Sequence, residues 1–483
     1  MKKKILISLL IGFMILTPIS AFAEVKTLQD YESNVTFKYV PEDQKTLDNI
    51  PEVGCKAVYI AEPTTGKVLY EKNAHEKMYP ASTTKILTAL VVLENCKLDE
   101  TAIVSQNAID LVPSDYTNAK LQAGESHTIK DLLYALLLPS ANEAANVLAE
   151  HVSGTIEAFA EKCNQRAKEL GCETLHFVNA NGMHDVNHYC SAYDLYLIAK
   201  ECKKYDAFNE IVKTKTYSLP TTDLYPYTRI IKNTNELLLS GTYYYANCTG
   251  IKTGHTSIAG ECFVGSSTYN GLDLISVVLG GKEQNSLGLN ERFYDTKQLC
   301  EFVYDNYSLK KIAEYGDLMV QINVGKATKD TAYLDVVVDA DISTIVPNDI
   351  DKDSINQTVS LNDDIVAPIK QNQVLGQVTY YVDGLVYKTN IIASHEVEKL
   401  PYLLYNSVIV GVIVLTIIIF AILLKKCKEK KKAVIIIGIV IFVIEGIGIF
   451  FIFKEGKERT VTKTVTAENI TANKKSDVDA QNI

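Results

Sequence analysis

The sequence predicts an α+β domain, then a small all-β domain and a C-terminal transmembrane helical hairpin. Three observations support this prediction. Strand-like segments at both ends of residues 51–310 enclose a helical block, which indicates an antiparallel sheet covered by helices. Residues 315–395 lose the helical period and alternate apolar with polar side chains. Two apolar runs near the C-terminus, each of about 20 residues, are long enough to cross a bilayer.

The first strands of the α+β domain are predicted at residues 57–60 and 68–70. Both segments are apolar or aromatic, and they flank the turn residues of 64–66. The sheet resumes after residue 250, where residues 262–268 and 272–279 flank an Asn-Gly pair. This dipeptide between two such runs is a strong hairpin signal, because both residues accept a positive φ.

Between these strands, residues 82–204 carry helical signals. Residues 86–94 are almost uninterruptedly apolar, and the run 132–138 ends at Pro139, which cannot continue a helix. The segment 156–170 is closed by a glycine, the usual residue after a helix. The helical block therefore contains several distinct helices.

The predicted β domain follows. Val320, Ile322 and Val324 alternate with polar residues, and the runs 334–338 and 374–382 lie between polar turns. No helix is expected in this part.

The N-terminus predicts export. Lysines at 2–4, an apolar run at 5–16 and the small-x-small site at 21–23 are typical of a signal peptide, residues 1–23, cleaved after Ala23. An uncleaved membrane anchor is the alternative. Residues 24–50 are polar and are expected to form a flexible lead-in.

The C-terminus predicts anchoring in the cell membrane. Membrane helices are expected at 404–424 and 433–453, and the lysine-rich residues 425–432 between them should stay in the cytoplasm. The main body of the chain and the polar tail, residues 454–483, would then both lie outside the cell.

Composition limits the other partners. The net charge of −10 argues against nucleic acid, which requires a basic face. Of the ten cysteines, Cys427 lies in the basic loop, and the other nine show no C-x-x-C pair and no metal spacing. An odd number of exported cysteines cannot form a complete disulfide framework, so buried free thiols are expected. The histidines outside the motifs below, His151 among them, also lack metal-ligand spacing, and no metal or organic cofactor is predicted.

The first chemical motif is Ser82 with Lys85, just before the apolar run 86–94. If Ser82 opens a helix, the two side chains share a face. A serine hydroxyl needs a base before it attacks, and a neutral lysine can serve. Burial and a second cation would both lower the pKa of that lysine. The alternative is a capping serine beside an exposed lysine.

The second and third motifs are a loop Ser-x-Asn and a Lys-Thr-Gly at a strand. Ser140 and Asn142 could pass a proton to a leaving group and hold a substrate amide. Lys252 and Thr253 can grip a carboxylate. Gly254 would let a substrate backbone lie against the strand edge.

These three motifs, in this order on a helix start, a loop and a strand, form the set of penicillin-binding proteins and class A β-lactamases. Residues 177–185 and 233–238 extend the likeness. The sequence resembles the low-molecular-mass penicillin-binding proteins, the serine D-alanyl-D-alanine carboxypeptidases, from about residue 50 to 310. The resemblance implies a penicillin-binding-protein/β-lactamase-like fold, and a β domain followed by a membrane anchor matches the family's layout.

The resemblance also implies roles for the reacting groups. Ser82 would be the acylated nucleophile and Lys85 its base, and Ser140 with Asn142 would complete the site. The reaction is removal of the terminal D-Ala from the pentapeptide stem of peptidoglycan, in cell-wall biosynthesis. A β-lactam would react with the same serine and act as a covalent inhibitor.

The substrate carboxylate would bind Lys252 and Thr253, beside Gly254. The backbone N–H of Ser82 would be one oxyanion donor and that of His255 the second, which leaves the His255 imidazole uncommitted. One departure is Thr234, which stands where some relatives carry an arginine thought to assist carboxylate binding. Affinity for the carboxylate would then depend on Lys252 and Thr253.

Three alternative functions share these motifs. A β-lactamase predicts a glutamate in an E-x-x-L-N stretch between the second and third motifs, and residues 143–251 contain none. A penicillin-sensing membrane receptor predicts a signalling domain, and none is recognisable after Phe453. An inactive wall scaffold would tolerate loss of a reactive residue, yet each of them is present.

Overall fold

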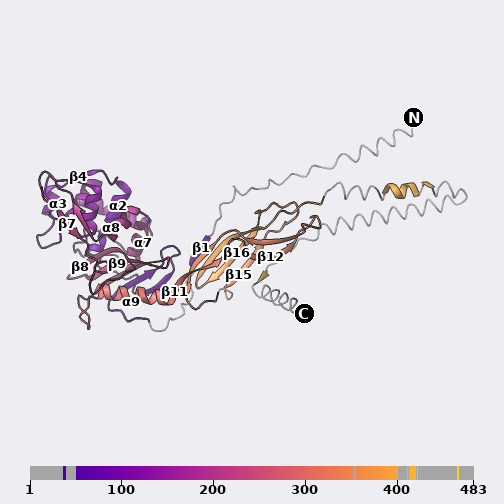
Figure 1. Cartoon of the computed structure of the whole chain (residues 1–483). Helices are drawn as coiled ribbons and strands as arrows, with labels where there is room; N and C mark the ends of the chain where they lie inside the picture. Colours follow the sequence, from indigo (N-terminus) through magenta and orange to yellow (C-terminus); the bar gives the residue numbers. More distant parts are fainter. Residues whose placement is uncertain are drawn as a thin grey trace, which may run out of the picture.

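The computed structural model (Figure 1) describes residues 36–39, 50–351, 355–400, 411, 413–419, 421–422 and 465–466. The predicted signal peptide, the loop 425–432 and the second predicted membrane helix lie outside the described residues. So does most of 404–424. Within the described part of the chain, no helix combines the length and apolar character that crossing a membrane requires.

The α+β part is built on a five-stranded antiparallel sheet with strand order β3-β2-β10-β9-β8. Its strands are β2 (Ala57–Ala61), β3 (Val68–Lys72), β8 (Cys248–Thr256), β9 (Gly260–Tyr269) and β10 (Leu272–Gly281). Both predicted hairpins are present, β2 with β3 and β9 with β10. Asn270 and Gly271 both adopt positive φ, 49° and 81°, as a tight two-residue turn requires. The strand β8 lies at an edge of this sheet.

The sheet separates two layers. On β2, Tyr59 belongs to the core that the helical block covers, whereas Val58 and Ile60 belong to the core beneath α9 (Glu291–Asn306). This alternation follows from the two-residue period of a strand. Figure 1 shows the helical block on one side of the sheet and α9 on the other.

The helical block was predicted in its main elements. The α4 helix stops before Pro139, and Gly171, with φ of 88°, follows α6, as expected. Two short antiparallel strand pairs were not predicted, β4 with β5 and β6 with β7. The helices are α2 (Lys85–Asn95), α3 (Gln106–Asp110), α4 (Ile129–Leu137), α5 (Asn142–Ser153), α6 (Ile156–Glu169), α7 (Ala192–Cys202) and α8 (Asp206–Lys213). The short strands are β4 (Thr101–Ile103), β5 (Ser126–Thr128), β6 (Thr216–Leu219) and β7 (Arg229–Lys232).

The all-β part begins at Tyr307, before the expected residue 315, because β11 pairs with β14. A larger sheet has the order β12-β13-β17-β16-β15-β18, and β1 (Thr36–Tyr39) pairs with β17. Thus a strand lies within the lead-in that was expected to be flexible, and β18 (Val465–Thr466) lies within the polar tail. The other strands are β11 (Tyr307–Ala313), β12 (Leu318–Asn323), β13 (Tyr333–Val338), β14 (Ile342–Pro347), β15 (Asn356–Leu361), β16 (Val374–Val382) and β17 (Leu385–Ala393).

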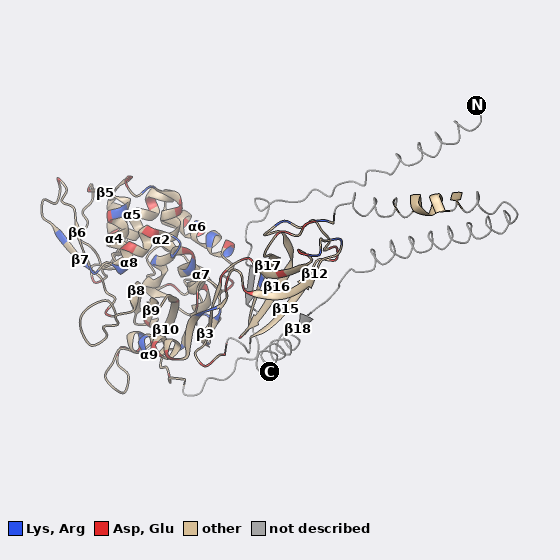
Figure 2. Ribbon diagram, turned by 45° about the vertical axis from the view of Figure 1, so that its right-hand side comes forward, with Lys and Arg blue, Asp and Glu red and all other residues tan. Residues whose placement is uncertain are grey.

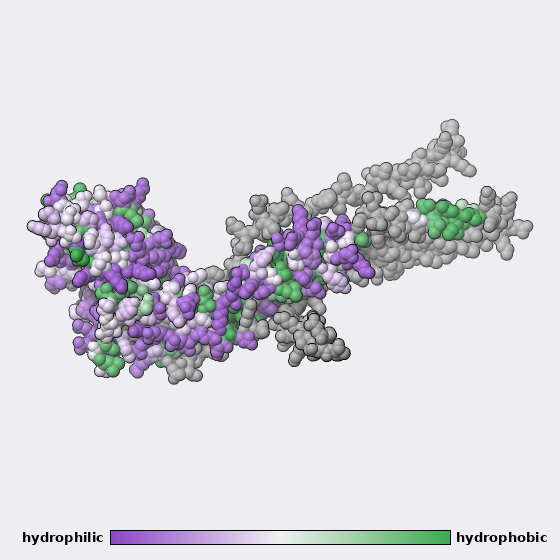
Figure 3. Space-filling model, in the orientation of Figure 1, coloured by the Kyte–Doolittle hydropathy of each residue, from purple (hydrophilic) through white to green (hydrophobic). Residues whose placement is uncertain are grey.

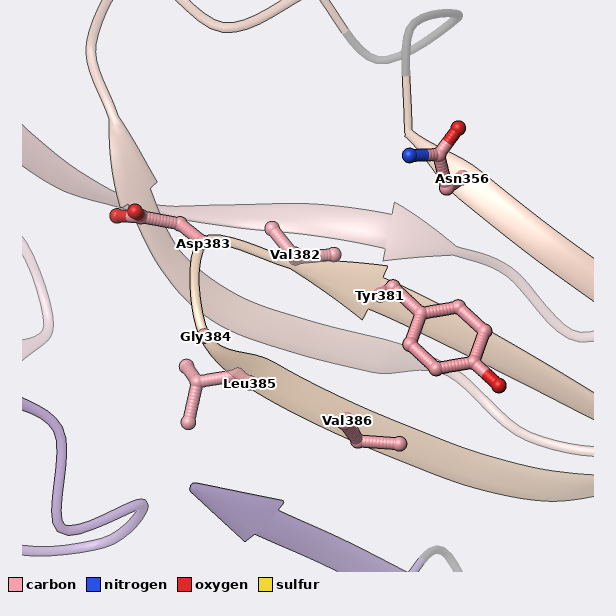
Figure 4. Close-up of a pocket in the computed structure, with 7 residues that line it drawn as sticks. All are labelled: Asn356, Tyr381, Val382, Asp383, Gly384, Leu385 and Val386. Carbon is pink, nitrogen blue, oxygen red and sulfur yellow. The ribbon is translucent and has the colours of Figure 1, made fainter. Parts of the chain in front are cut away.

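The β16–β17 turn contacts the catalytic domain. Asp383 in this turn forms an ion pair with the buried Lys67, whose Nζ also donates to the Asp383 carbonyl at 2.9 Å. Figure 4 shows a pocket beside the same turn, between Tyr381, Val386 and Asn356. This pocket belongs to the β domain and contains none of the predicted catalytic residues.

The helical block carries charges of both signs, and the described cysteines form no disulfide. In Figure 2, acidic and basic residues are interspersed over the helical block, and neither sign is gathered in one region of the view. The nine described cysteines are free, as expected, and Cys427 lies outside the described residues. Cys96 and Cys172 are half-buried. The buried thiols are Cys55, Cys163, Cys190, Cys202, Cys248, Cys262 and Cys300.

Candidate active site

The predicted nucleophile lies in a single 3₁₀ turn, η2 (Ala81–Thr84), that runs directly into α2. The predicted base, Lys85, is the first residue of α2. Its Nζ lies 2.9 Å from the Ser82 Oγ. The three-residue spacing therefore brings the two groups into hydrogen-bond contact, as the sequence indicated.

Lys85 is fully buried. Besides Ser82, its Nζ contacts the Asn142 Oδ1 at 2.8 Å and the carbonyl oxygen of Asn181 at 2.5 Å. All three partners are uncharged oxygens. Burial, followed by the positive charge of Lys252, lowers the pKa of Lys85 well below its usual value, and Glu143 opposes the shift.

This environment suits a neutral amine. A neutral lysine has two N–H bonds and one lone pair. Two oxygens, from Asn142 and Asn181, can accept the N–H bonds, which leaves the lone pair for the Ser82 hydroxyl. The arrangement can therefore take a proton from the serine.

The segment 177–185 supports this arrangement from one side. The Thr88 hydroxyl donates to the Ala180 carbonyl at 2.6 Å, which holds the segment against α2. Gly182 has a φ of 83°, and a Cβ there would lie 1.9 Å from the Ala81 carbonyl oxygen. Only glycine permits this approach. The contacts of Ala180 and Gly182 therefore hold the carbonyl of Asn181, the residue between them, against Lys85.

The loop between α4 and α5 brings the second motif to Lys85. Asn142 donates from Nδ2 to the Thr117 carbonyl at 2.9 Å, which directs its Oδ1 at the lysine. Ser140 has a φ of 67°, in the left-handed region, and its buried Oγ has no hydrogen-bond partner among the described residues. Backbone strain and an unpaired buried hydroxyl each cost free energy, and both are typical of functional positions.

The third motif lies on β8. Lys252 is 1 % exposed, and burial followed by the charge of Arg292 lowers its pKa to about 7. Its Nζ donates to the Thr253 carbonyl at 3.0 Å. The Thr253 hydroxyl lies 2.6 Å from the hydroxyl of Thr234, the residue that replaces an arginine of some relatives. The pair of hydroxyls gives this end of the site neutral hydrogen-bonding groups beside the lysine.

Gly254 has a use that the sequence did not indicate. A Cβ at this residue would lie 2.9 Å from the Pro80 carbonyl oxygen and 3.0 Å from the backbone nitrogens of Ser82 and Thr83. The missing side chain thus lets β8 touch the serine turn. This close approach places the strand beside the nucleophile.

His255 follows on the same strand and is its one exposed residue. Its side chain is 54 % exposed, and its Nε2 lies 3.7 Å from the Glu261 carboxylate. The imidazole therefore faces Glu261.

Arg292 was not predicted from the sequence. It stands near the start of α9, its Nη1 donates to the Gly254 carbonyl at 3.1 Å, and it forms an ion pair with Glu261 at 2.6 Å. No local pattern marks an arginine forty residues after a Lys-Thr-Gly, so only the packing of α9 on β8 reveals it. Arg292 thus adds a third basic side chain to the site, beside Lys85 and Lys252.

The chain matches two family models. Residues 44–283 match the D-alanyl-D-alanine carboxypeptidase model, and residues 307–399 match the C-terminal domain of penicillin-binding protein 5. The chain is 30% identical over 404 residues to the D-alanyl-D-alanine carboxypeptidase DacF of Bacillus subtilis, across 82% of this chain and 95% of that one. The chain belongs to the D-alanyl-D-alanine carboxypeptidase family.

Solved structures of similar proteins agree with this membership. The peptidoglycan synthesis regulatory factor PBP3 of Streptococcus pneumoniae superposes with a TM-score of 0.58 at 26% identity, covering 72% of this chain and all of that chain. Penicillin-binding protein 5 of Haemophilus influenzae gives 0.55 at 25% identity, with 73% and 99% covered. The carboxypeptidase fold, a penicillin-binding-protein catalytic domain followed by an all-β domain, is as predicted.

Membership also settles the enzyme class. The protein is a serine-type D-alanyl-D-alanine carboxypeptidase, which the sequence predicted, and a peptidoglycan D-Ala-D-Ala terminus and β-lactams fit this family. The carboxypeptidase assignment is favoured over the β-lactamase, receptor and scaffold alternatives.

Proposed function

We propose that this carboxypeptidase removes the terminal D-Ala of the pentapeptide stem through an ester on Ser82. The observation that carries the proposal is the 2.9 Å contact between Ser82 Oγ and a buried Lys85 whose partners are all uncharged. Lys85 takes the hydroxyl proton as Oγ attacks the penultimate D-Ala carbonyl. The C–N bond then breaks, D-Ala leaves, and water hydrolyses the ester.

The oxyanion would bind two backbone N–H groups, of Ser82 and of His255. The contact of Gly254 with the serine turn supports this pairing, because it brings β8 and η2 together. β8 is also an edge strand with one unpaired side, so an extended peptide can pair with it. Donors fixed in this way stabilise charge that develops in the transition state.

The terminal carboxylate would bind Lys252 and the hydroxyl of Thr253. Arg292, paired with Glu261, donates to the Gly254 carbonyl and so holds β8 in place beside Lys252 and Thr253. Thr234 holds the Thr253 hydroxyl in place from the side.

Ser140 would pass the proton to the leaving amine, and Asn142 would orient Lys85 and hold a substrate amide. The unpaired Ser140 hydroxyl and the contact between Asn142 Oδ1 and Lys85 support these roles. A hydroxyl without a hydrogen-bond partner among the described residues is free to exchange a proton with substrate.

The test is release of D-Ala from diacetyl-Lys-D-Ala-D-Ala. The native enzyme should release one D-Ala per peptide, and Ser82→Ala should release none above the uncatalysed rate. A matched control is Lys213→Arg on the exposed end of α8, which should leave the rate unchanged. Peptide turnover by a folded Ser82→Ala variant would contradict the acyl-enzyme route.

We further propose export by residues 1–23 and anchoring by two membrane helices, 404–424 and 433–453, with both the catalytic domain and the tail outside the cell. Among the described residues of the first helix, Val414, Leu415 and several isoleucines are exposed, as Figure 3 shows for 413–419. Exposed apolar side chains are stabilised when lipid covers them.

A thiol reagent that does not cross membranes tests this topology in intact cells, with the labelled peptide read by mass spectrometry. Cys427, in the cytoplasmic loop, should stay unlabelled, whereas a cysteine introduced by Ser476→Cys in the tail should react. Labelling of Cys427 would contradict the hairpin.

A further inference from the structure

Three potential metal ligands lie close together near the C-terminal ends of α2 and α5, whereas Lys85 and Asn142 begin these two helices. Cys96 caps the C-terminal end of α2, Glu100 lies in the turn before β4, and His151 lies in the last turn of α5. Their ligand atoms all lie within 4.8 Å of one another. Sequence spacing did not reveal this group, because His151 is brought to the others only by the packing of α5 against α2.

The distances approach those of a bound ion. The Glu100 Oε2 lies 3.5 Å from the His151 Nε2. In a tetrahedral zinc site, with bonds of about 2.0–2.3 Å, neighbouring ligand atoms lie about 3.3–3.6 Å apart. The Cys96 Sγ lies within 4.8 Å of both atoms, so it must move toward them when an ion binds.

The turn that carries two of the ligands is fixed by hydrogen bonds. The N–H of Lys97 donates to the Glu100 Oε1 at 3.0 Å, which leaves Oε2 directed at the histidine. The N–H of Ile129 donates to the Glu100 carbonyl at 2.8 Å, and that of Lys130 donates to the Leu98 carbonyl at 3.0 Å. A carboxylate oriented by a second hydrogen bond is the arrangement that supports metal ligands in proteins.

We propose that Cys96, Glu100 and His151 form a zinc site whose fourth position is open to solvent. Thiolate, imidazole and carboxylate together are a ligand set that suits Zn²⁺, whereas Mg²⁺ and Ca²⁺ prefer oxygen alone. The side chains of Glu100 and His151 are 42% and 29% exposed, so an ion can enter and keep a water molecule.

Binding forms a Zn–S bond and breaks the S–H bond, and the thiol proton goes to solvent. The imidazole binds in its neutral form and the carboxylate in its charged form.

The position of the site gives it a structural effect. α2 begins with Lys85 and α5 begins with Asn142, and these residues contact each other at 2.8 Å. A zinc ion would join the opposite ends of the same two helices. The pair would then be linked at both ends, which should resist separation of the base from its partner.

The test uses the purified full-length chain, kept reduced, with Co²⁺ as a spectroscopic substitute and Zn²⁺ in calorimetry. One equivalent of Co²⁺ should give a thiolate-to-metal charge-transfer band that Zn²⁺ abolishes, and Zn²⁺ should raise the Tm. Cys96→Ser should remove the band and weaken Zn²⁺ binding by at least about 100-fold, since it deletes a direct ligand.

Two further variants keep the proposal falsifiable. His151→Gln changes an exposed side chain, should not disturb folding, and should also lower the affinity for Zn²⁺. The matched control is Cys172→Ser, a half-buried thiol elsewhere, which should leave the band and the Kd unchanged. An identical band in Cys96→Ser, or no band in the native chain, would overturn the zinc site.

Discussion

Replacing Lys85 with arginine isolates the base of the proposed mechanism. A guanidinium keeps the positive charge and can still donate to Asn142 and Asn181, but it does not deprotonate at working pH. What the variant loses is therefore the lone pair that faces Ser82 at 2.9 Å. General-base catalysis contributes roughly 10²–10⁴-fold. Since each tenfold corresponds to about 1.36 kcal/mol, the acylation barrier should rise by about 2.7–5.4 kcal/mol.

The assay is the acylation rate, followed with a fluorescent penicillin and, independently, by D-Ala release from the peptide. Because burial and Lys252 lower the pKa of Lys85, the native rate should rise with pH as Lys85 loses its proton. This rise of the acylation rate with pH should be absent in Lys85→Arg. Lys85 is fully buried and arginine is larger, so the Tm of the variant must show that it folds, with Lys213→Arg as the control. Acylation within tenfold of the native rate by a folded Lys85→Arg would refute the reasoning.

Three further predictions follow from the same geometry. Penicillin should add one persistent penicilloyl group, because the leaving amine stays tethered and obstructs the approach of water. Intact-mass spectrometry should detect this group in the native enzyme and not in Ser82→Ala, whereas rapid multiple turnover of penicillin would indicate a β-lactamase. The KM for the peptide should rise with pH above about 7, since Lys252 has a pKa of about 7 and only its charged form attracts the carboxylate. The Lys252→Gln variant should have a higher KM that does not vary with pH in that range. Gly254→Ala should slow acylation at least about tenfold in a folded protein, because the added Cβ would lie 3.0 Å from the Ser82 nitrogen and displace the serine turn. An unchanged acylation rate would mean that β8 can move to accept the Cβ without displacing Ser82.

Local patterns predicted the parts of the site that depend on local geometry. A Ser-x-x-Lys at a helix start places both side chains on one face wherever the helix forms, and Asn270-Gly271 fixes a hairpin on its own. These features required no knowledge of the rest of the chain. The roles of the residues remain proposals, but the contact between Ser82 and Lys85 is the one expected.

The remaining features depend on distant packing. The Asn181 carbonyl reaches Lys85 because Gly182 lets its segment touch Ala81, and Arg292 reaches Gly254 because α9 lies beneath the sheet. Neither contact has a periodicity or a spacing that one sequence can display. The strand pairs β4–β5 and β6–β7 were not predicted for a different reason, because strands of three or four residues are too short to establish an alternation.

The reactivity of the free cysteines can report local unfolding of the enzyme. A thiol reacts as the thiolate and only when a reagent reaches it, and burial raises the pKa of Cys163, Cys202 and Cys262 while it excludes reagent. Cys202 and Cys262 are buried on α7 and β9 respectively, so each reports on a different element. The rate at which each is alkylated in the native protein then measures how often its own element separates from its neighbours. Peptide-resolved alkylation would thus yield a map of local unfolding free energies without any introduced label.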